Sequence, residues 1–270
     1  MDASDRRPLA VVTGASTGIG RELAKQFAQH GFDLIVAADE DAIHEAAREL
    51  EALGARIEAV QVDLTRPEGV DELYGRIRAR AASVDAIALN AGIGMGGAFA
   101  TETDLDQELA IVDLNCRSTV HLSKLVVRDM VAAASGRMLF TSSIASTMPG
   151  SFQAVYNASK SFVQSFALAL RDELKDTGVT VTSLMPGPTD TEFFDRADML
   201  DTRVGASDSK DDPADVAREG FEAMMEGKER VVSSSLATKL QARASRFIPD
   251  SAKAALHRKM AEPGSAEKDH

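Results

Sequence analysis

The stretch LAVVTGASTGIG, residues 9–20, decides how the chain folds. Its first four residues are apolar and predict a short buried strand, and a helical pattern with Leu23, Phe27 and Ala28 on one side follows its last glycine. A strand, a glycine-rich turn and a helix N-terminus together offer backbone N–H groups and a helix dipole to a phosphate. A plain strand-to-helix turn is the alternative, but Thr13 in front and the helix behind favour the phosphate site.

Outward from this stretch, apolar runs and helical patterns alternate along the chain. Alternating strands and helices indicate a parallel sheet with helices on both faces. We therefore expect an α/β protein with a doubly wound, Rossmann-type, three-layer sandwich around a seven-stranded parallel sheet. The strands are expected at residues 9–12, 32–38, 56–62, 84–89, 137–141, 179–185 and 230–233.

The composition is that of a soluble globular protein, with 44% hydrophobic and 27% charged residues among 270. The formal net charge of −12 argues against non-specific nucleic-acid binding, which needs lysine and arginine to neutralise phosphates. Cys116 is the only cysteine, so neither an intrachain disulfide nor a cysteine-held metal is expected. The first residues lack the apolar core of a signal peptide, and no run approaches the ~18 apolar residues of a membrane span, so we expect a cytoplasmic protein.

A second stretch, SSIASTMPGSFQAVYNASK at residues 142–160, carries groups suited to proton transfer. Tyr156 and Lys160 open a helical segment, and their spacing places both side chains on one helical face. A free tyrosine has a pKa of about 10, and a lysine ammonium held nearby is expected to lower that pKa. The Ser143 hydroxyl would then hold a carbonyl or alcohol oxygen beside the phenol, which would act as a general acid/base. Taken alone, Tyr-x-x-x-Lys is common by chance and favours a core tyrosine and a surface lysine.

Several motifs occur in one order along the chain: T-G-x-x-x-G-x-G at 13–20, N-A-G at 90–92, Ser143 with Tyr156-x-x-x-Lys160, and P-G-x-x-x-T at 186–191. Together they resemble the signature of the short-chain dehydrogenase/reductase family over roughly residues 8–233. The resemblance implies sheet order 3-2-1-4-5-6-7, a bound nicotinamide dinucleotide, and reversible hydride transfer between it and a secondary alcohol or carbonyl. It also implies a homodimer or homotetramer assembled through the two long helices that precede and follow Ser143.

The resemblance assigns roles to four residues. Tyr156 is the acid/base, Ser143 orients the substrate oxygen, and Lys160 lowers the tyrosine pKa and bonds the nicotinamide ribose. Asn115, in a helix expected over 104–132, kinks that helix and holds a water of the proton relay; a surface amide or a local backbone contact is the alternative. No metal site is expected.

The resemblance also assigns the dinucleotide contacts. The glycine turn takes the pyrophosphate, residues after the third and fourth strands take the adenosine, and the segment after the sixth strand takes the nicotinamide amide. Position 189 is more often valine or isoleucine in the family, which blurs that contact. The implied contacts are Gly14, Ser16, Thr17, Gly18, Ile19, Gly20, Asp39, Asp63, Leu64, Asn90, Ala91, Gly92, Tyr156, Lys160, Pro186, Gly187, Thr189 and Thr191.

Asp39 decides the choice between NAD and NADP. It follows the second strand, where an acidic side chain accepts bonds from the adenosine ribose and an arginine binds a 2′-phosphate. NADP-dependent members usually carry arginine at this position. NAD-dependent members more often carry their acidic residue one position earlier, where this chain has Ala38. A 2′-phosphate about 4 Å from Asp39 would be repelled by roughly 4 kcal/mol per charge pair at intermediate dielectric. We expect NAD rather than NADP; the alternative is that residues 39–41 only supply the acidic start of the next helix.

Residues 192–212 lack periodicity and mix aromatic side chains with charges, which predicts a substrate lid. The expected pocket suits a medium-sized, fairly apolar substrate. Two other functions stay open: an NADP-dependent carbonyl reductase of the same family, and a non-catalytic dinucleotide-sensing regulator or scaffold. The candidate pocket residues are Met95, Ser143, Met148, Phe152, Phe193, Phe194 and Met199.

Three segments are expected: a single Rossmann-type catalytic domain at 1–234, a basic helical extension at 235–262 and a disordered tail at 263–270. Residues 236–260 hold six lysines and arginines against one aspartate. A lid packed on the domain, a subunit contact and a helix on an anionic membrane surface all fit that pattern. The membrane contact is the least favoured of the three.

Overall fold

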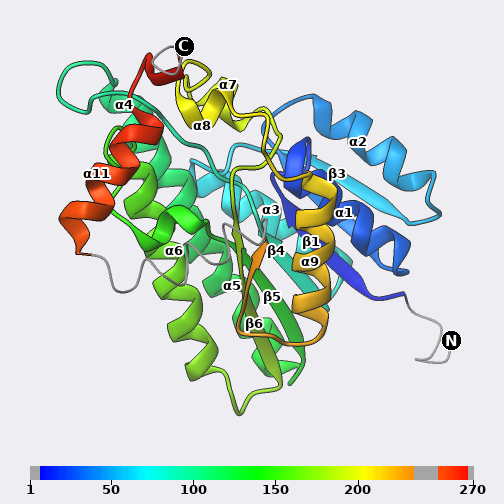
Figure 1. Cartoon of the computed structure of the whole chain (residues 1–270). Coiled ribbons are helices and arrows are strands. Elements are labelled where there is room, and N and C mark those ends of the chain that lie inside the picture. Colours follow the sequence, from blue (N-terminus) through cyan, green and yellow to red (C-terminus); the bar gives the residue numbers. More distant parts are fainter. Residues whose placement is uncertain (1–6, 234–248, 267–270) are drawn as a thin grey trace, which may run out of the picture.

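The computed structural model describes residues 7–233 and 249–266. Parallel strands form one seven-stranded sheet in the order β3-β2-β1-β4-β5-β6-β7, which confirms the expected fold class (Figure 1). The strands are β1 (Leu9–Thr13), β2 (Asp33–Ala38), β3 (Ile57–Gln61), β4 (Ala86–Leu89), β5 (Gly136–Thr141), β6 (Val179–Pro186) and β7 (Arg230–Ser233).

Helices follow most of the strands, as the alternating sequence pattern predicts. Among the described helices, the π-helix contains Asn115, and the 3-10 helix begins directly after Ser143 at the end of the fifth strand. The helices are α1 (Gly18–Gln29), α2 (Ala42–Glu51), α3 (Pro67–Arg80), α4 (Leu105–Ile111), the π-helix η2 (Val112–Ser118), α5 (Thr119–Ala132), the 3-10 helix η3 (Ile144–Thr147), α6 (Ala154–Glu173), α7 (Phe193–Arg196), α8 (Arg203–Ala206), α9 (Pro213–Met225) and α11 (Asp250–Ala261).

The sheet lies between two layers of helices, and alternate residues of β1 face the two layers. Leu9 and Val11 belong to an apolar cluster with α3, α5 and α6, whereas Ala10 and Val12 belong to a cluster with α1, α2 and α9. In Figure 1 α1 and α9 lie on one side of the sheet and α5 and α6 on the other. All of β1 is buried, which is why its sequence is a continuous apolar run.

The strand order reverses at β1, which pairs with β2 on one side and with β4 on the other. In doubly wound sheets, ligands bind in the crevice outside the carboxyl ends of the strands at this point. The glycine turn follows β1 and the N-A-G segment follows β4, so both motifs lie at this crevice.

The helix expected over 104–132 is interrupted. α4 passes into the π-helix η2, which passes into α5, and Asn115 lies in the middle of η2. π-bulges inside α-helices are rare and occur frequently at functional sites. The interruption therefore lies at the asparagine where the family resemblance predicts a kink.

The lid region and the C-terminal helix pack against each other. Residues 192–212 contain the short helices α7 and α8, and α11 contacts α8. Phe194, Ala197 and Met199 share a small apolar cluster with Ala261, separate from the two clusters on the sheet. Figure 1 shows α7, α8 and α11 together in the upper part of the molecule.

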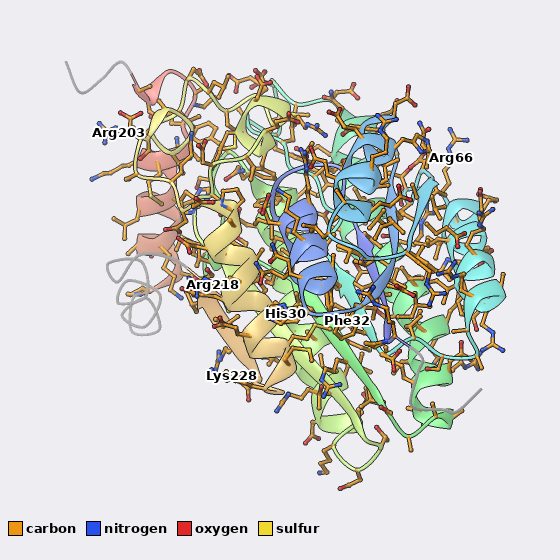
Figure 2. All side chains as sticks on the ribbon, turned by 90° about the vertical axis from the view of Figure 1, so that its right-hand side faces the viewer. His30, Phe32, Arg66, Arg203, Arg218 and Lys228 are labelled. Atoms are coloured by element: carbon orange, nitrogen blue, oxygen red, sulfur yellow. The ribbon has the colours of Figure 1, made fainter. Side chains whose placement is uncertain are left out.

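The disordered tail expected over 263–270 needs correction at residues 263–266. Gly264 turns the chain with φ 68°, and its N–H donates to the Asp201 carboxylate at 2.6 Å. Ser265 is buried, and its hydroxyl accepts a hydrogen bond from the Arg203 N–H at 3.0 Å. Figure 2 shows Arg203 beside the C-terminal helix. Composition could not reveal these bonds, because their partners lie 62 and 63 residues earlier in the chain; residues 267–270 lie outside the described residues.

In the described ranges, 7–233 and 249–266, no helix combines the length and apolarity that crossing a membrane requires. The membrane-surface contact considered for 236–260 falls partly on residues 236–248, which lie outside the described residues. Its described part is α11, which packs on α8. That packing fits the alternative of a lid on the domain.

Candidate active site

Tyr156 and Lys160 lie one turn apart near the start of α6 and line one cavity. Lys160 is 5% exposed, and its Nζ donates to the Thr141 carbonyl at 3.1 Å. This nitrogen lies 5.8 Å from the centroid of the Tyr156 ring. The lysine is thus not the surface residue of the simpler interpretation.

The pKa values of this pair differ from the sequence-based expectation. Burial raises the pKa of Tyr156 to about 12, and a hydrogen bond from Ser143 acts in the opposite direction. Burial lowers the pKa of Lys160 to about 8. We expected the ammonium to lower the tyrosine pKa, but Lys160 is not among the groups that shift it here. The free-energy cost of burying a phenolate is larger than the stabilisation that the hydrogen bond from Ser143 provides.

Asn115 connects η2 to two neighbouring segments. Its Oδ1 accepts from the Ile93 N–H at 3.0 Å, while its Nδ2 donates to the Ile93 carbonyl and to Ser159 Oγ, both at 2.9 Å. Asn115 is 1% exposed, which argues against a surface amide. At Gly92, an added Cβ would lie 3.0 Å from Lys160 Nζ and 3.1 Å from Asn115 Oδ1. The missing side chain at position 92 therefore leaves room for both groups.

Ser143 lies between β5 and η3 and lines the cavity with Tyr156. It is the N-cap of η3, and its hydroxyl accepts from the Ala145 N–H at 3.1 Å. That bond fixes the direction of the hydroxyl. On the other side of the phenol, the Phe193 ring from α7 lies 5.1 Å away between centroids.

The start of α1 fits a pyrophosphate. No side chain of the described chain caps this helix, and its first turn holds no acidic residue, so its N–H groups and dipole are available to an anion. Gly14 and Gly18 have φ of 64° and 54°, which side chains rarely adopt. A Cβ on Gly14 would also lie 2.8 Å from the Ala91 Cα. The turn therefore needs these glycines, and the residues around it present donors to the cavity.

Thr13 and Asn90 fasten the ends of three strands. The Thr13 hydroxyl accepts from the N–H groups of Asn90 and Ala91 at 3.0 and 3.1 Å. Asn90 Nδ2 donates to the Thr13 and Gly14 carbonyls, and Asn90 Oδ1 accepts from the Thr141 hydroxyl at 3.0 Å. These bonds hold β1, β4 and β5 together where the cofactor is expected.

The cavity brings together most of the residues expected to hold the cofactor. Gly20 does not line it, because it packs on the Gly14 carbonyl and the Asn90 amide. Asn115 lies behind the lining residues, bonded to Ile93. The expected residues that line the cavity are Gly14, Ser16, Thr17, Gly18, Ile19, Asp39, Asp63, Leu64, Asn90, Ala91, Gly92, Ser143, Tyr156, Lys160, Pro186, Gly187, Thr189 and Thr191.

The expected substrate wall needs correction. Met148, Phe193 and Phe194 line the cavity, but Met95, Phe152 and Met199 do not. Met199 is fully buried in the small apolar cluster that Phe194, Ala197 and Ala261 also form, and Phe152 packs on that cluster. The Arg258 guanidinium lies 4.9 Å from the centroid of the Phe152 ring. Residue type alone could not separate side chains that face the cavity from those packed beneath the lid.

Sequence reasoning missed several residues of the same cavity. Gln153, Arg196 and His257 line it, together with Met260 and Ala261 from α11. Arg196 forms ion pairs with Glu40 and Glu192. The basic helical extension predicted at 235–262 includes α11, with a lid packed on the domain as one interpretation, but no residue of it was predicted to line the cavity. Residues 7–233 and 249–266 hold no group of three or more His, Cys, Asp or Glu side chains placed to bind a metal.

Comparison with known families places this site in context. The family model described as short chain dehydrogenase matches residues 8–199. An uncharacterized oxidoreductase of Staphylococcus saprophyticus is 33% identical over 220 residues, which cover 81% of this chain and 91% of that protein. The 1-deoxy-11-beta-hydroxypentalenate dehydrogenase of Streptomyces exfoliatus is 35% identical over 207 residues, covering 74% of this chain and 75% of that protein.

A solved structure agrees with these relatives. The short-chain dehydrogenase from Sphingobium yanoikuyae in complex with NADPH superposes with a TM-score of 0.79 at 26% identity. The match covers 88% of this chain and 93% of that one. Similarity over this length extends beyond the glycine turn to the whole seven-stranded sheet.

Proposed function

This chain belongs to the short-chain dehydrogenase family and is an NAD(P)-dependent dehydrogenase or reductase; from that premise we propose reversible oxidation of a secondary alcohol to a ketone, with Tyr156 as the acid/base. The observation that carries the proposal is the common cavity of Ser143, Tyr156 and Lys160, which continues to the start of α1. A nicotinamide dinucleotide bound there would supply the hydride chemistry.

The residues of this chain would place the substrate and move its proton. Ser143, already oriented by Ala145, would donate to the substrate oxygen. Tyr156 would donate its phenolic proton to that oxygen during reduction and recover it during oxidation. Lys160 would donate to the nicotinamide ribose. Asn115, through its bonds to Ile93, would fix the position of η2 beside a water of the proton relay. The high pKa of Tyr156 keeps the phenol protonated, which suits the reductive direction.

We propose NAD as the preferred cofactor. Asp39 and Glu40 line the cavity after β2, and their carboxylates would repel a 2′-phosphate and accept bonds from ribose hydroxyls. One observation favours the NADP alternative: Arg196 lines the same cavity and supplies a cation. Its charge is already shared between Glu40 and Glu192, which is why we favour NAD.

The proposed substrate is medium-sized and mostly apolar. Met148, Phe193, Phe194, Val204 and Met260 give the cavity an apolar wall beyond the phenol. The dehydrogenase of Streptomyces exfoliatus is named for a pentalenate. A wall of this kind supports a compact carbon skeleton over a highly charged substrate.

We further propose that the protein is a homodimer or homotetramer. Apolar side chains on α4, η2 and α6 are exposed, among them Leu105 at 66%, Leu109 at 50% and Phe162 at 43%. Exposed apolar patches on monomeric proteins are usually small, so a contiguous one marks an interaction surface. A second copy of the chain would cover it.

Replacement of Tyr156 by Phe tests the catalytic proposal. The variant should lose about 10²–10⁴-fold in turnover of cyclic and aryl ketones, because it keeps the ring and loses the proton. Binding of NADH, followed by its fluorescence, should stay unchanged. The other tyrosine offers a matched control: Tyr74 donates to Asp129 at 2.9 Å and lies outside the cavity, so Tyr74→Phe should keep full turnover.

Fluorescence titrations with NADH and NADPH, together with the turnover measurements, decide between the alternatives. Tighter binding of NADPH than of NADH would overturn the cofactor assignment at Asp39. Undiminished turnover in Tyr156→Phe would remove the acid/base role. Dinucleotide binding with no ketone or alcohol turned over by the unaltered protein would favour the sensing regulator.

A further inference from the structure

The helix α11 contributes to the wall of the cavity and lies outside every motif described above. His257, Met260 and Ala261 line the cavity from this helix. His257 is 6% exposed, so it is an enclosed polar side chain, as is Gln153 of the same cavity. Phe193, Phe194 and Met148 make up much of the rest of that wall.

One ring nitrogen of His257 is committed to the protein. Its Nδ1 lies 2.9 Å from the backbone carbonyl oxygen of Ser151. A carbonyl oxygen can only accept, so Nδ1 must carry the hydrogen. In a neutral imidazole the other nitrogen, Nε2, is then unprotonated and is a hydrogen-bond acceptor.

The surroundings of His257 keep the ring neutral. Burial lowers its pKa, and the Ser151 carbonyl acts in the opposite direction with a smaller effect. The nearest charged residues of α11 are engaged elsewhere: Lys253 with Asp250, and Arg258 with the Phe152 ring. Within residues 7–233 and 249–266 no carboxylate pairs with the ring, so only the Ser151 carbonyl offsets part of the cost of a buried imidazolium.

The second ring nitrogen has no partner among residues 7–233 and 249–266. Nε2 accepts no hydrogen bond from the described residues. It is also not among their fully enclosed polar atoms that lack a partner, so this nitrogen is accessible. Because His257 lines the cavity and is otherwise buried, the space that Nε2 reaches is the cavity.

We propose that His257 is a specificity-determining residue that selects substrates carrying a hydrogen-bond donor, a hydroxyl or an N–H group, away from the reacting carbon. Such a donor pairs with Nε2 when the substrate fills the cavity. A substrate that ends in an ether or an alkyl group displaces water from Nε2 and leaves a buried acceptor unpaired, which is costly. The inference rests on the proposed dehydrogenase activity, because the substrate is what meets the histidine.

A series of methyl ketones tests this pairing. Each ketone with a terminal hydroxyl is compared with its methyl ether, which accepts but cannot donate, and with the plain alkyl ketone. Chain length is varied so that one member spans the distance from Tyr156 to His257. For that member, kcat/KM should exceed that of its methyl ether by about tenfold, as expected for one buried hydrogen bond between neutral groups.

Matched variants separate recognition from folding. His257→Asn keeps an amide N–H for the Ser151 carbonyl and removes the acceptor, so the hydroxyl-to-ether ratio should fall close to one. His257→Gln returns an amide oxygen near the place of Nε2 and should recover part of the ratio. Met260→Leu alters the same wall without a polar group, and the ratio should persist whatever happens to kcat. NADH binding reports whether each variant is folded.

The ring itself gives a second measurement. Long-range proton–nitrogen spectra of the histidine rings should show a protonated Nδ1 and a bare Nε2 for the signal that disappears in His257→Asn. Two results would overturn this inference and leave the proposed function standing: a protonated Nε2, or an enzyme that turns over ketones with a hydroxyl-to-ether ratio of kcat/KM that does not change when His257 is replaced. An unaltered protein that turns over no ketone with either dinucleotide overturns the proposed function as well.

Discussion

At the scale of single residues, Lys160 holds a charge where water cannot stabilise it. It is 5% exposed, its Nζ donates to the Thr141 carbonyl, and burial lowers its pKa from 10.5 to about 8. A shift of that size corresponds to about 3 kcal/mol of lost stability when the amine is charged. The position of Lys160 therefore costs stability when the amine is charged, as the proposed role beside Tyr156 would require.

The stability of the protein should therefore depend on this lysine in a defined pH window. Because the pKa of Lys160 is lower in the folded protein, the unfolded chain binds the proton first as the pH falls from 10.5 towards 8. The free energy of unfolding therefore declines across that window, and the full cost is present below pH 8. Lys160→Met removes the titrating group. The free energy of unfolding of the variant, relative to the unaltered protein, should rise by up to about 3 kcal/mol between pH 10 and pH 7.

Urea unfolding of both proteins across this pH range measures the difference. The variant should also lose turnover, since the amine is gone. Lys124→Met is a matched control, because Lys124 is exposed on α5. Parallel stability curves for Lys160→Met and the unaltered protein would show that the buried amine does not titrate in this window.

At the scale of elements, the lid is fastened at two ends. Arg196 at the end of α7 pairs with Glu40, which follows β2, and with Glu192. On the other side, Asp201 and Arg203 bond to residues 264 and 265. The first connection links the lid to the expected adenosine site, and both Arg196 and Glu40 line the cavity.

Arg196→Gln should speed the release of NADH. The pair is partly exposed, at 46% for Arg196 and 33% for Glu40, so its loss should change the stability of the fold by no more than about 1 kcal/mol. A cofactor beneath the pair would leave only after it opens, and the dissociation rate should rise about fivefold, the equivalent of about 1 kcal/mol. Stopped-flow fluorescence measures that rate, and the difference from the unaltered protein should shrink at high salt.

Arg218 supplies the control for this experiment. It forms surface ion pairs with Asp215 and Glu222 on α9 and does not line the cavity, so Arg218→Gln should leave NADH release unchanged. Glu40→Gln should speed release as Arg196→Gln does, with no added effect in the double variant. If Arg196→Gln weakens NADPH more than NADH, the arginine is instead a ligand of the 2′-phosphate.

The sequence predicted the elements that carry their own local signals. The glycine turn, Tyr156 and Lys160 each lie at a strand end or a helix start within a periodic pattern, so pattern and spacing were enough to place them. His257 has no such signal, because its place depends on a contact with Ser151, 106 residues away in the chain. The pKa of Tyr156 was beyond reach for a similar reason: burial is a property of the assembled site.

At the scale of the whole molecule, one face of the helical layer is unusually apolar. Exposed apolar side chains on α4, η2 and α6 flank an open groove lined by Phe99, Val112, Cys116, Ala154, Val155, Ala158 and Ser159. The sequence pattern showed an apolar helix face but could not separate internal core from subunit contact. In the structure part of α6 is exposed, with Phe162 at 43%, which supports the subunit contact.

Leu109→Glu should weaken the proposed assembly, because it introduces a charge into the apolar face. Light scattering after size-exclusion chromatography should show a dimer or tetramer for the unaltered protein and a smaller species for the variant. Leu53 offers a matched control: it is 43% exposed against 50% for Leu109, and it follows α2, away from this face. Leu53→Glu should keep the native mass, and an unaltered protein that is monomeric at micromolar concentration would exclude the assembly.

Asp201 and Arg203 of the lid bond to residues 264 and 265 after α11, and this contact limits how the C-terminal segment can be exchanged with that of a relative. The family match ends at residue 199, after all the residues proposed for proton transfer, whereas α8 and α11 come from later in the chain. Part of the cavity wall, from Val204, His257 and Met260, therefore comes from the later portion of the chain, while Met148, Phe193 and Phe194 come from the earlier one. A chimaera that exchanges the later portion with that of a relative would change only this part of the wall and keep Ser143, Tyr156 and Lys160, provided that the bonds at Asp201 and Arg203 are transplanted with it.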